Sequence, residues 1–143
     1  MTMPLEGMVV LDTTQVMAGP FCTLLLADMG AEVIKVEKPD GDDSRRIGPP
    51  FIKGESAAYL GINRNKQGVV LDLRTDPGKD AFRRLAAQAD VVVENFRPGT
   101  MDRLGLGADA LRKDHLELIY VSISVFGQTG PHLMDLALGT DRR

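Results

Sequence analysis

The feature that most constrains the fold is a stretch near the start, residues 5–39, whose pattern is strand, loop, helix and strand. Residues 8–11 and 33–36 are apolar runs of strand length. Between them, Pro20 suits the first turn of a helix and Gly30 suits its end. Two strands joined through a helix favour parallel pairing, so this stretch predicts a βαβ unit.

The loop at residues 13–19 carries the chemistry of this unit. The helix expected over about residues 20–29 turns its free N–H groups, and the positive end of its dipole, toward that loop. A phosphate or a carboxylate would be stabilised there. Every α/β crossover begins in this way, however, and most such helix ends hold only water. The pattern alone leaves both interpretations open.

Later segments repeat the alternation of strands and helices. Near-continuous runs of Val, Ile and Leu occupy residues 69–73, 90–94 and 117–122. Thr75 suits the cap of a helix over residues 76–88, and a shorter helix is expected over residues 108–113. Residues 38–57, rich in Pro, Gly and charge, are expected to form a long loop. The alternation indicates a doubly wound, Rossmann-like α/β fold, with a mostly parallel sheet and helices on both faces.

Composition narrows the class of protein. The 143 residues are 43% hydrophobic, and a net charge of −3 argues against a nucleic-acid partner. No apolar run approaches the ~20 residues of a membrane span, and the first residues lack the pattern of a signal peptide, so we expect a cytoplasmic protein with no membrane partner. Cys22, His115 and His132 are too few soft ligands for a zinc site, so no metal is expected.

Basic residues recur where the strands of the expected sheet end. Lys38, Arg74 and Arg97 each follow a strand, and Arg103 lies one short helix further along. Any one of them is most simply a solvated surface charge. Parallel α/β sheets bind ligands at the carboxyl ends of their strands. The recurrence of cations at that edge therefore predicts an anion site.

A nicotinamide dinucleotide is the first candidate for such an anion. Its usual site needs Gly-x-Gly-x-x-Gly in the first loop, so that the backbone can approach the pyrophosphate, and an acid after the second strand. Glu37 supplies the acid, but the loop reads Val-Met-Ala-Gly-Pro at residues 16–20. The missing glycines argue against a dinucleotide.

Several segments together resemble one family, the family III coenzyme A transferases, also called the L-carnitine dehydratase and bile-acid-inducible family. The matching pieces, in order and at natural spacing, are PLEGMVVLD, VMAGPFCTLLLADMGAEVIKVEKP, GDDSR, NRNKQGVVLDLRT, DVVVENFRPGTMDRLGLG and SVFGQTGP. They cover about residues 4–131. The family includes formyl-CoA and succinyl-CoA transferases and the α-methylacyl-CoA racemases.

The resemblance implies a coenzyme A thioester as a substrate, with no permanently bound cofactor, and a carboxylic acid as the second partner. The positions that contact CoA in the family fall here on Val16, Met17, Ala18, Lys38, Leu71, Asp72, Leu73, Arg74, Asn95, Phe96, Arg97 and Arg103. Lys38, Arg74 and Arg103 would meet the 3′-phosphate and the pyrophosphate of CoA. Apolar Val16, Ala18 and Leu71 suit the adenine and the pantetheine arm.

Two positions depart from the family pattern. Position 17 is Gln in formyl-CoA transferases, and Met17 removes an amide that could bond the reacting acyl group, which weakens an assignment to oxalate or formate. Val125 stands where the family usually has Gly. A β-branched residue is a problem there if the backbone needs a positive φ or a close approach to the ligand.

The resemblance also sets expectations for catalysis and assembly. In the transferases an Asp attacks the thioester, and that Asp is expected beyond Arg143; Asp141 comes too early, so no catalytic residue is assigned. We expect a CoA-binding domain at residues 1–131 and a divergent tail at residues 132–143. The resemblance thus identifies this chain as an amino-terminal fragment of an enzyme that transfers CoA between an acyl-CoA thioester and a carboxylic acid, and we expect the fragment alone to be inactive. Full-length family members form interlocked homodimers, and we expect the fragment to self-associate. An acyl-CoA racemase, or a non-catalytic fragment that binds CoA or pairs with full-length subunits, remains an alternative.

Overall fold

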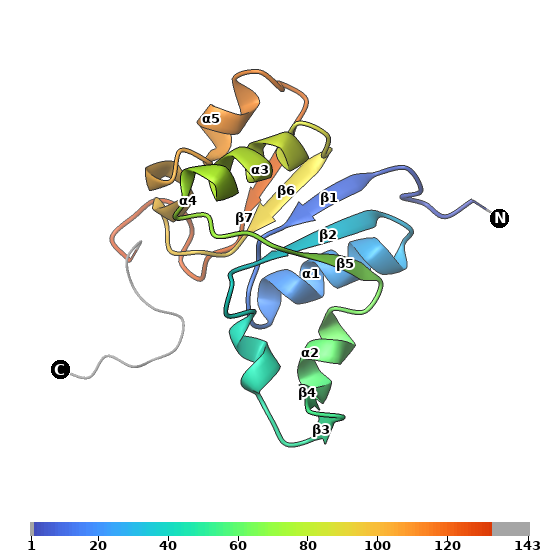
Figure 1. The fold of residues 1–143 in the computed structure, drawn as a ribbon. Helices are drawn as coiled ribbons and strands as arrows, with labels where there is room; N and C mark the ends of the chain where they lie inside the picture. The colour runs from blue at the N-terminus through green and yellow to red at the C-terminus, as the bar shows by residue number, and fades with distance from the viewer. Residues whose placement is uncertain (1, 133–143) are drawn as a thin grey trace.

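Five parallel strands form the central sheet of the computed structural model, which describes residues 2–132 (Figure 1). Their order across the sheet is β5-β2-β1-β6-β7. Counted along the chain, this is the doubly wound order in which the direction of winding reverses between β1 and β6. The strands span β1 (Val9–Asp12), β2 (Glu32–Glu37), β5 (Lys66–Val70), β6 (Val91–Glu94) and β7 (Ile119–Ser122).

Helices cover both faces of this sheet, as the sequence predicts. Side chains alternate along each strand, so neighbouring residues of β1 face opposite sides. Val10 packs with Ala27 of helix α1 (Ala18–Asp28) on one face. Leu11 packs with Phe82 of α3 (Asp76–Ala86) on the other, where the short helices α4 (Thr100–Arg103) and α5 (Ala108–Arg112) also lie (Figure 1). Thr75 caps α3 as expected, its hydroxyl accepting a hydrogen bond from the N–H of Gly78.

The sheet strand that the sequence places at residues 69–73 lies about three residues earlier, as β5 (Lys66–Val70). Strand β5 pairs with β2 from Lys66 opposite Val33 to Val70 opposite Glu37. The expectation is wrong because β5 begins with Lys66, and a charged residue does not match the apolar pattern by which a strand is recognised. The ammonium of Lys66 is nevertheless buried in the structure. Residues 71–73 leave the sheet beyond its carboxyl edge.

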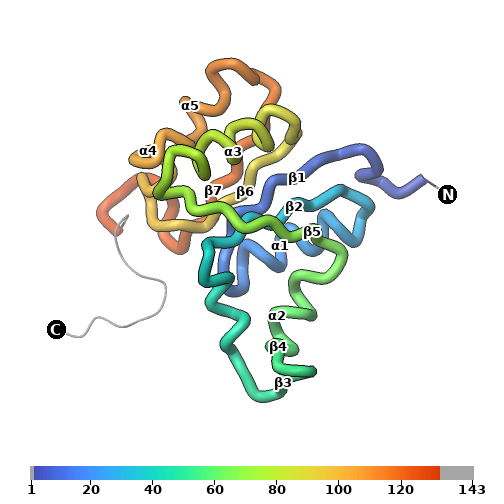
Figure 2. Tube along the Cα trace, viewed as in Figure 1, coloured from blue at the N-terminus to red at the C-terminus, as the bar shows by residue number. Residues whose placement is uncertain are grey.

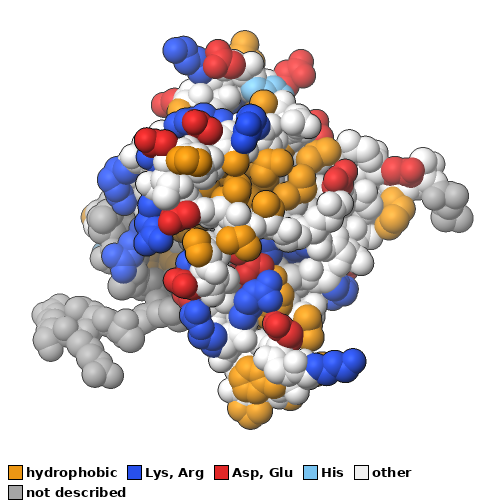
Figure 3. Space-filling model, viewed as in Figure 1, with side chains coloured by type: hydrophobic (Ala, Val, Ile, Leu, Met, Phe, Trp, Pro, Cys, Tyr) orange, Lys and Arg blue, Asp and Glu red, His pale blue; other side chains and the backbone are white. Residues whose placement is uncertain are grey.

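The expected loop at residues 38–57 contains regular structure. It includes the 3₁₀ helix η1 (Asp43–Arg46) and a hairpin of β3 (Phe51–Ile52) and β4 (Glu55–Ser56), and helix α2 (Ala57–Ile62) follows. The segment projects from one end of the sheet (Figure 2), and hydrophobic side chains are exposed at its tip (Figure 3). Elements of two to six residues are too short for periodicity to reveal.

The remaining boundaries agree with the sequence to within about two residues. Helices within residues 2–132 are all too short or too polar to cross a bilayer. On the face that Figure 3 shows, acidic and basic side chains are interspersed rather than separated by sign.

Replacing Phe82 by Ala tests the core between α3 and the sheet. The Phe82 side chain is fully buried, so the substitution should lower the free energy of unfolding by about 3–5 kcal/mol, measured by urea denaturation. Phe51→Ala is the matched control, because Phe51 is half exposed at the hairpin tip, and it should cost less than about 1 kcal/mol. Equal losses in the two variants would contradict this view of the core.

Candidate functional site

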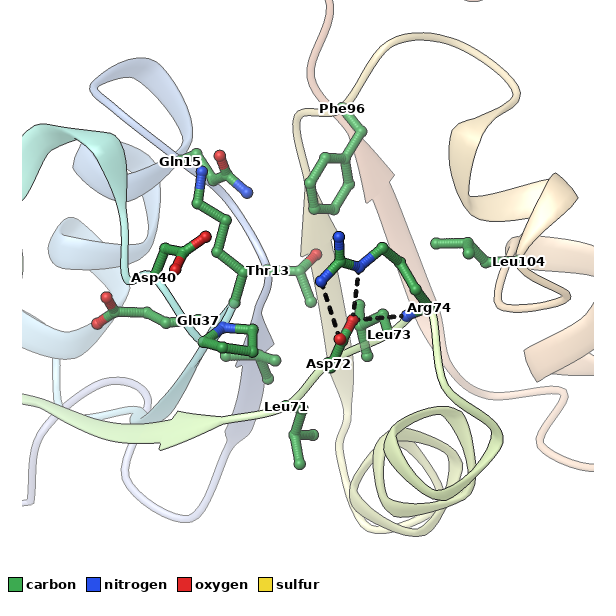
Figure 4. Close-up of a pocket in the computed structure, with 13 residues that line it drawn as sticks. Thr13, Gln15, Glu37, Asp40, Leu71, Asp72, Leu73, Arg74, Phe96 and Leu104 are labelled. Carbon is green, nitrogen blue, oxygen red and sulfur yellow. Dashed lines mark hydrogen bonds and ion pairs between the residues drawn. The ribbon is translucent and has the colours of Figure 1, made fainter.

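A pocket of about 230 Å³ lies at the carboxyl edge of the sheet (Figure 4). The loops that follow β1, β2, β5 and β6 build most of it, together with the end of β2 and Leu104 at the end of α4. Six residues that the sequence analysis assigns to CoA contribute to its walls: Lys38, Leu71, Asp72, Leu73, Arg74 and Phe96. The other lining residues are not among the CoA-contacting positions that the resemblance implies: Thr13, Gln15, Val36, Glu37, Pro39, Asp40 and Leu104.

The interior of the pocket is apolar and its rim is charged. Leu71, Leu73 and Leu104 contribute aliphatic surface, and the ring of Phe96 faces the guanidinium of Arg74 (Figure 4). A flat or extended apolar group fits such walls. Lys38 and Arg74 add positive charge at the edge, where an anionic group attached to that ligand would lie.

Each of the two cations already has an acidic partner. The guanidinium of Arg74 donates from Nε and Nη2 to the two carboxylate oxygens of Asp72, both at 2.9 Å. These bonds hold the pKa of Asp72 below its usual range. Lys38 Nζ lies 2.8 Å from Asp43 Oδ1. Because the Arg74 side chain is 81% exposed, an incoming phosphate can reach it by exchanging with Asp72.

The remaining predicted contacts lie outside the pocket lining. Val16, Met17 and Ala18 are exposed in the loop after β1 and at the start of α1. Arg97 lines a separate cavity. Arg103 lies at the end of α4 and donates to the hydroxyl of Thr100 at 3.1 Å. The structure thus gathers half of the predicted residues into one pocket and distributes the others around it.

Asn95 is placed to hold the loop after β1. Its side-chain oxygen accepts from the N–H of Gln15 at 2.8 Å, and its Nδ2 donates to the carbonyl of Gln15 at 2.9 Å. A Cβ at Gly19 would overlap the side chain of Thr14, so glycine is required where α1 approaches this loop. These contacts fix the position of Gln15 on the pocket wall.

Val16, the next residue, has an unusual backbone conformation. Its φ is 67°, in the left-handed region that β-branched residues rarely adopt. Such a conformation costs on the order of 1–3 kcal/mol and persists only where the surroundings impose it. The N–H of Val16 donates to Oδ1 of Asp42 at 3.1 Å. No local pattern in the sequence marks Asp42 as a loop contact, although it lies in the Gly-Asp-Asp-Ser-Arg segment that carries part of the resemblance.

Two buried ion pairs lie beneath the loop. Lys35 Nζ is 2.9 Å from Asp42 Oδ2, and Lys66 Nζ is 3.0 Å from Asp12 Oδ2, with all four side chains at most 1% exposed. Burial raises the pKa of Asp42, but hydrogen bonds from the Ser44 backbone and from Lys35 lower it overall. Burial lowers the pKa of Lys66, and Asp12 opposes that shift.

Glu37 lines the pocket, but its carboxylate is bonded within a third polar cluster, formed with Arg45 and Tyr59. Arg45 donates to both of its oxygens at 2.8 Å, and the hydroxyl of Tyr59 donates to Oε1 at 2.6 Å. Burial raises the pKa of Glu37, yet the bonds from Arg45, from Tyr59 and from the Asp42 backbone outweigh it and lower that pKa to about 2. A carboxylate held so firmly in its charged form is a poor general base.

A second cavity, of about 110 Å³, lies beside α4 and includes Glu94, Arg97 and Tyr120. Burial raises the pKa of both Glu94 and Tyr120. Glu94 also accepts from the N–H of Phe96 at 2.8 Å, so it helps to position the loop that carries the pocket's aromatic wall.

The described pocket is suited to binding rather than to covalent chemistry. The hydroxyl of Thr13, which lines the pocket, is buried and donates to the carbonyl of Val93 at 3.0 Å. Among residues 2–132, no three His, Cys, Asp or Glu side chains are placed to hold a metal ion.

Met17 and Val125, the two departures from the family pattern, are both exposed. Asp141 and residues 133–143 of the expected tail lie outside the described residues.

Comparison with known proteins gives one consistent family. The family model described as CoA-transferase family III matches residues 5–141. Succinyl-CoA:glutarate CoA-transferase of Homo sapiens is 49% identical over 129 residues, which are 90% of this chain and 30% of that protein. Succinyl-CoA:mesaconate CoA-transferase of Haloarcula hispanica is 52% identical over 128 residues, 86% of this chain and 32% of that protein.

Solved structures agree with this result. A CAIB/BAIF family protein from Brucella suis superposes with a TM-score of 0.91 at 44% identity, covering 94% of this chain and 37% of that one. The orthorhombic form of Rv3272 from Mycobacterium tuberculosis gives a TM-score of 0.86 at 48% identity, covering 92% and 36%. The chain spans about a third of the length of the curated relatives it matches.

The Glu37 cluster predicts a pH-dependent stability. Folding lowers the pKa of Glu37 from 4.5 to about 2, so its contribution is complete above pH 4.5 and is lost as the pH falls toward 2. At pH 7, Glu37→Gln should lower the free energy of unfolding by about 1–3 kcal/mol, and by less than half of that at pH 3, measured by urea denaturation. Glu32→Gln, at the exposed start of the same strand, is the matched control. An advantage of wild type over Glu37→Gln that is equal at both pH values would contradict this assignment.

Proposed function

Because the chain belongs to CoA-transferase family III, we propose that the protein transfers coenzyme A between an acyl-CoA thioester and a carboxylic acid. The observation that supports this function best is the pocket at the carboxyl edge of the sheet, where Lys38 and Arg74 flank apolar walls. We assign CoA binding to residues 1–131, as the sequence analysis does. CoA is here a substrate, and no permanent cofactor is proposed.

The chemistry of CoA matches the composition of this pocket. CoA joins a planar adenine and an apolar pantetheine arm to a 3′-phosphate and a pyrophosphate. Leu71, Leu73 and Phe96 provide surface for the uncharged parts. Arg74 can present two parallel N–H groups to a phosphate once it releases Asp72, and Lys38 adds a point charge.

Transfer is favoured over racemisation. A racemase would use the same CoA site but move a proton at the α-carbon, which needs a positioned acid and base. Glu37, the buried carboxylate of the pocket, is held by Arg45 and Tyr59. The relatives described above are named as CoA-transferases, for glutarate and for mesaconate. A dicarboxylic acid is accordingly the acceptor class that we propose to test first.

Replacing Arg74 by Ala tests the CoA site. Loss of a bidentate phosphate contact should weaken CoA binding about tenfold or more, measured by isothermal titration calorimetry. Arg74→Ala combined with Arg103→Ala should abolish detectable binding. Arg84→Ala is the matched control, because Arg84 is an exposed arginine on α3 outside the pocket, and it should bind CoA like the wild type. Unchanged affinity in a folded Arg74→Ala variant would exclude this pocket as the CoA site.

We also propose that the chain associates with itself. Met17, Phe21, Leu25 and Met29 recur every fourth residue from the N-cap to the C-cap of α1, and each is 44–52% exposed. Within the described residues, strands β5 and β7 pair on one side only, so both edges of the sheet are open. Exposed apolar stripes and open edges both favour pairing with another chain.

Light scattering at several concentrations tests this association. The average mass should rise with concentration, and the double variant Phe21→Glu/Leu25→Glu should remain closer to the monomer mass because it places charge in the stripe. Ile52→Glu is the control, since Ile52 is equally exposed but lies at the hairpin tip. A wild-type chain that is monomeric at every concentration would refute the proposal.

A further inference from the structure

The strained turn at Val16 lies beside the proposed CoA site. Thr13 and Gln15 line the pocket, and Val16 is the residue at which the chain turns away toward α1. The backbone at Val16 is left-handed, with a φ of 67°. Since valine avoids this conformation, a specific contact must impose it.

Asp42 supplies that contact. The side chain of Asn95 bonds both the backbone N–H and the backbone carbonyl of Gln15. Neither of these bonds involves Val16. The N–H of Val16 is instead bonded to Oδ1 of Asp42 at 3.1 Å. Gln15 is held by Asn95, just after β6, and the Val16 N–H is directed to Asp42, so the chain turns at Val16 toward the start of α1.

The carboxylate of Asp42 is itself rigidly held. The Asp42 side chain is fully buried, and Oδ1 also accepts from the N–H and the hydroxyl of Ser44, at 2.9 and 2.8 Å. Its Oδ2 is paired with Lys35 at 2.9 Å, and the same ammonium donates to the carbonyl of Thr14 at 2.8 Å. The ion pair therefore holds the loop at two points. Lys35 bonds the carbonyl of Thr14, and Asp42 bonds the N–H of Val16.

A buried ion pair is weak evidence for a gain in stability, because desolvation offsets the attraction between the charges. Specification of one local conformation is the better-supported use of such a pair. Here the conformation specified is the turn that joins the pocket wall to Met17 and Ala18.

We propose that Asp42 is a positioning residue for CoA binding, which acts by holding Val16 in the left-handed conformation. The proposal rests on the proposed function, because CoA is the ligand whose site this turn borders. Asp42 does not line the pocket, so its effect on the ligand passes through the backbone of the loop.

Two paired variants isolate the contact. In Lys35→Met/Asp42→Asn the ion pair is removed, but the Asn oxygen can still accept from Val16. In Lys35→Met/Asp42→Ala the acceptor is removed as well. Adding Val16→Gly to each relieves the need for an imposed turn, because glycine adopts positive φ freely. CoA affinity is measured by calorimetry and the free energy of unfolding by urea denaturation.

The Asn variant should bind CoA within about threefold of wild type, and the Ala variant about tenfold more weakly than the Asn variant. The effect of Val16→Gly on CoA affinity should be at least about threefold more favourable in the Ala variant than in the wild type, because loss of the Val16 side chain is common to both. A purely structural Asp42 would give equal affinities in the folded Asn and Ala variants, or the same effect of Val16→Gly in the Ala variant and in the wild type. Either result overturns the proposal.

Hydrogen exchange at the Val16 amide separates this inference from the proposed function. The amide should be protected in the wild type and the Asn variant and should exchange faster in the Ala variant, whether or not CoA binds. Equal protection in all three overturns the positioning role, whereas absent CoA binding by the wild type counts against the function alone. If the Lys35 variants do not fold, Val16→Pro replaces them, because Pro fixes φ near about −65° and removes the N–H. A folded Val16→Pro protein with wild-type CoA affinity would also overturn the proposal.

Discussion

The arrangement of the carboxyl edge depends on two buried ion pairs, Asp12 with Lys66 and Lys35 with Asp42. Buried charges are tolerated only when each finds a full set of partners, because desolvation alone would expel them. The three N–H groups of Lys66 have four acceptors within 3.0 Å, among them the carbonyl of Pro20 and the hydroxyl of Thr23, and so tie β5 to β1 and α1. Lys35 and Asp42 likewise hold the loop after β1 against the segment that follows β2, through Thr14 and Val16.

The fold could be predicted where local pattern and tertiary role agree. Apolar runs gave β1, β2, β6 and β7, and Thr75 marked the start of α3. Prediction failed at β5, because Lys66 and the exposed Gly68 do not resemble an apolar strand even though they pair with β2. A strand at the edge of a sheet is specified by its neighbour as much as by its own side chains.

The site could be predicted in part, where a local pattern of charged residues agreed with their position in the fold. Cations after successive strands indicated an anion site at one edge, and Lys38 and Arg74 do lie there. Local spacing did not indicate that the guanidinium of Arg74 would be bonded to the carboxylate of Asp72. Nor could it show that Asp42 would reach Val16, since those residues are 26 positions apart and meet only through the fold. Long-range polar contacts of this kind have no periodic signature in the chain.

The internal pairing of the rim has a kinetic consequence. Lys38 faces Asp43 and Arg74 faces Asp72, so each cation and its acid largely cancel at distances beyond their own separation. A highly charged ligand is therefore not drawn toward the pocket by a long-range field, and its rate of encounter should respond little to ionic strength. The pocket therefore selects between anions only on contact. A ligand phosphate is retained when its hydrogen bonds to Arg74 or Lys38 fit better than those of the carboxylate that it displaces.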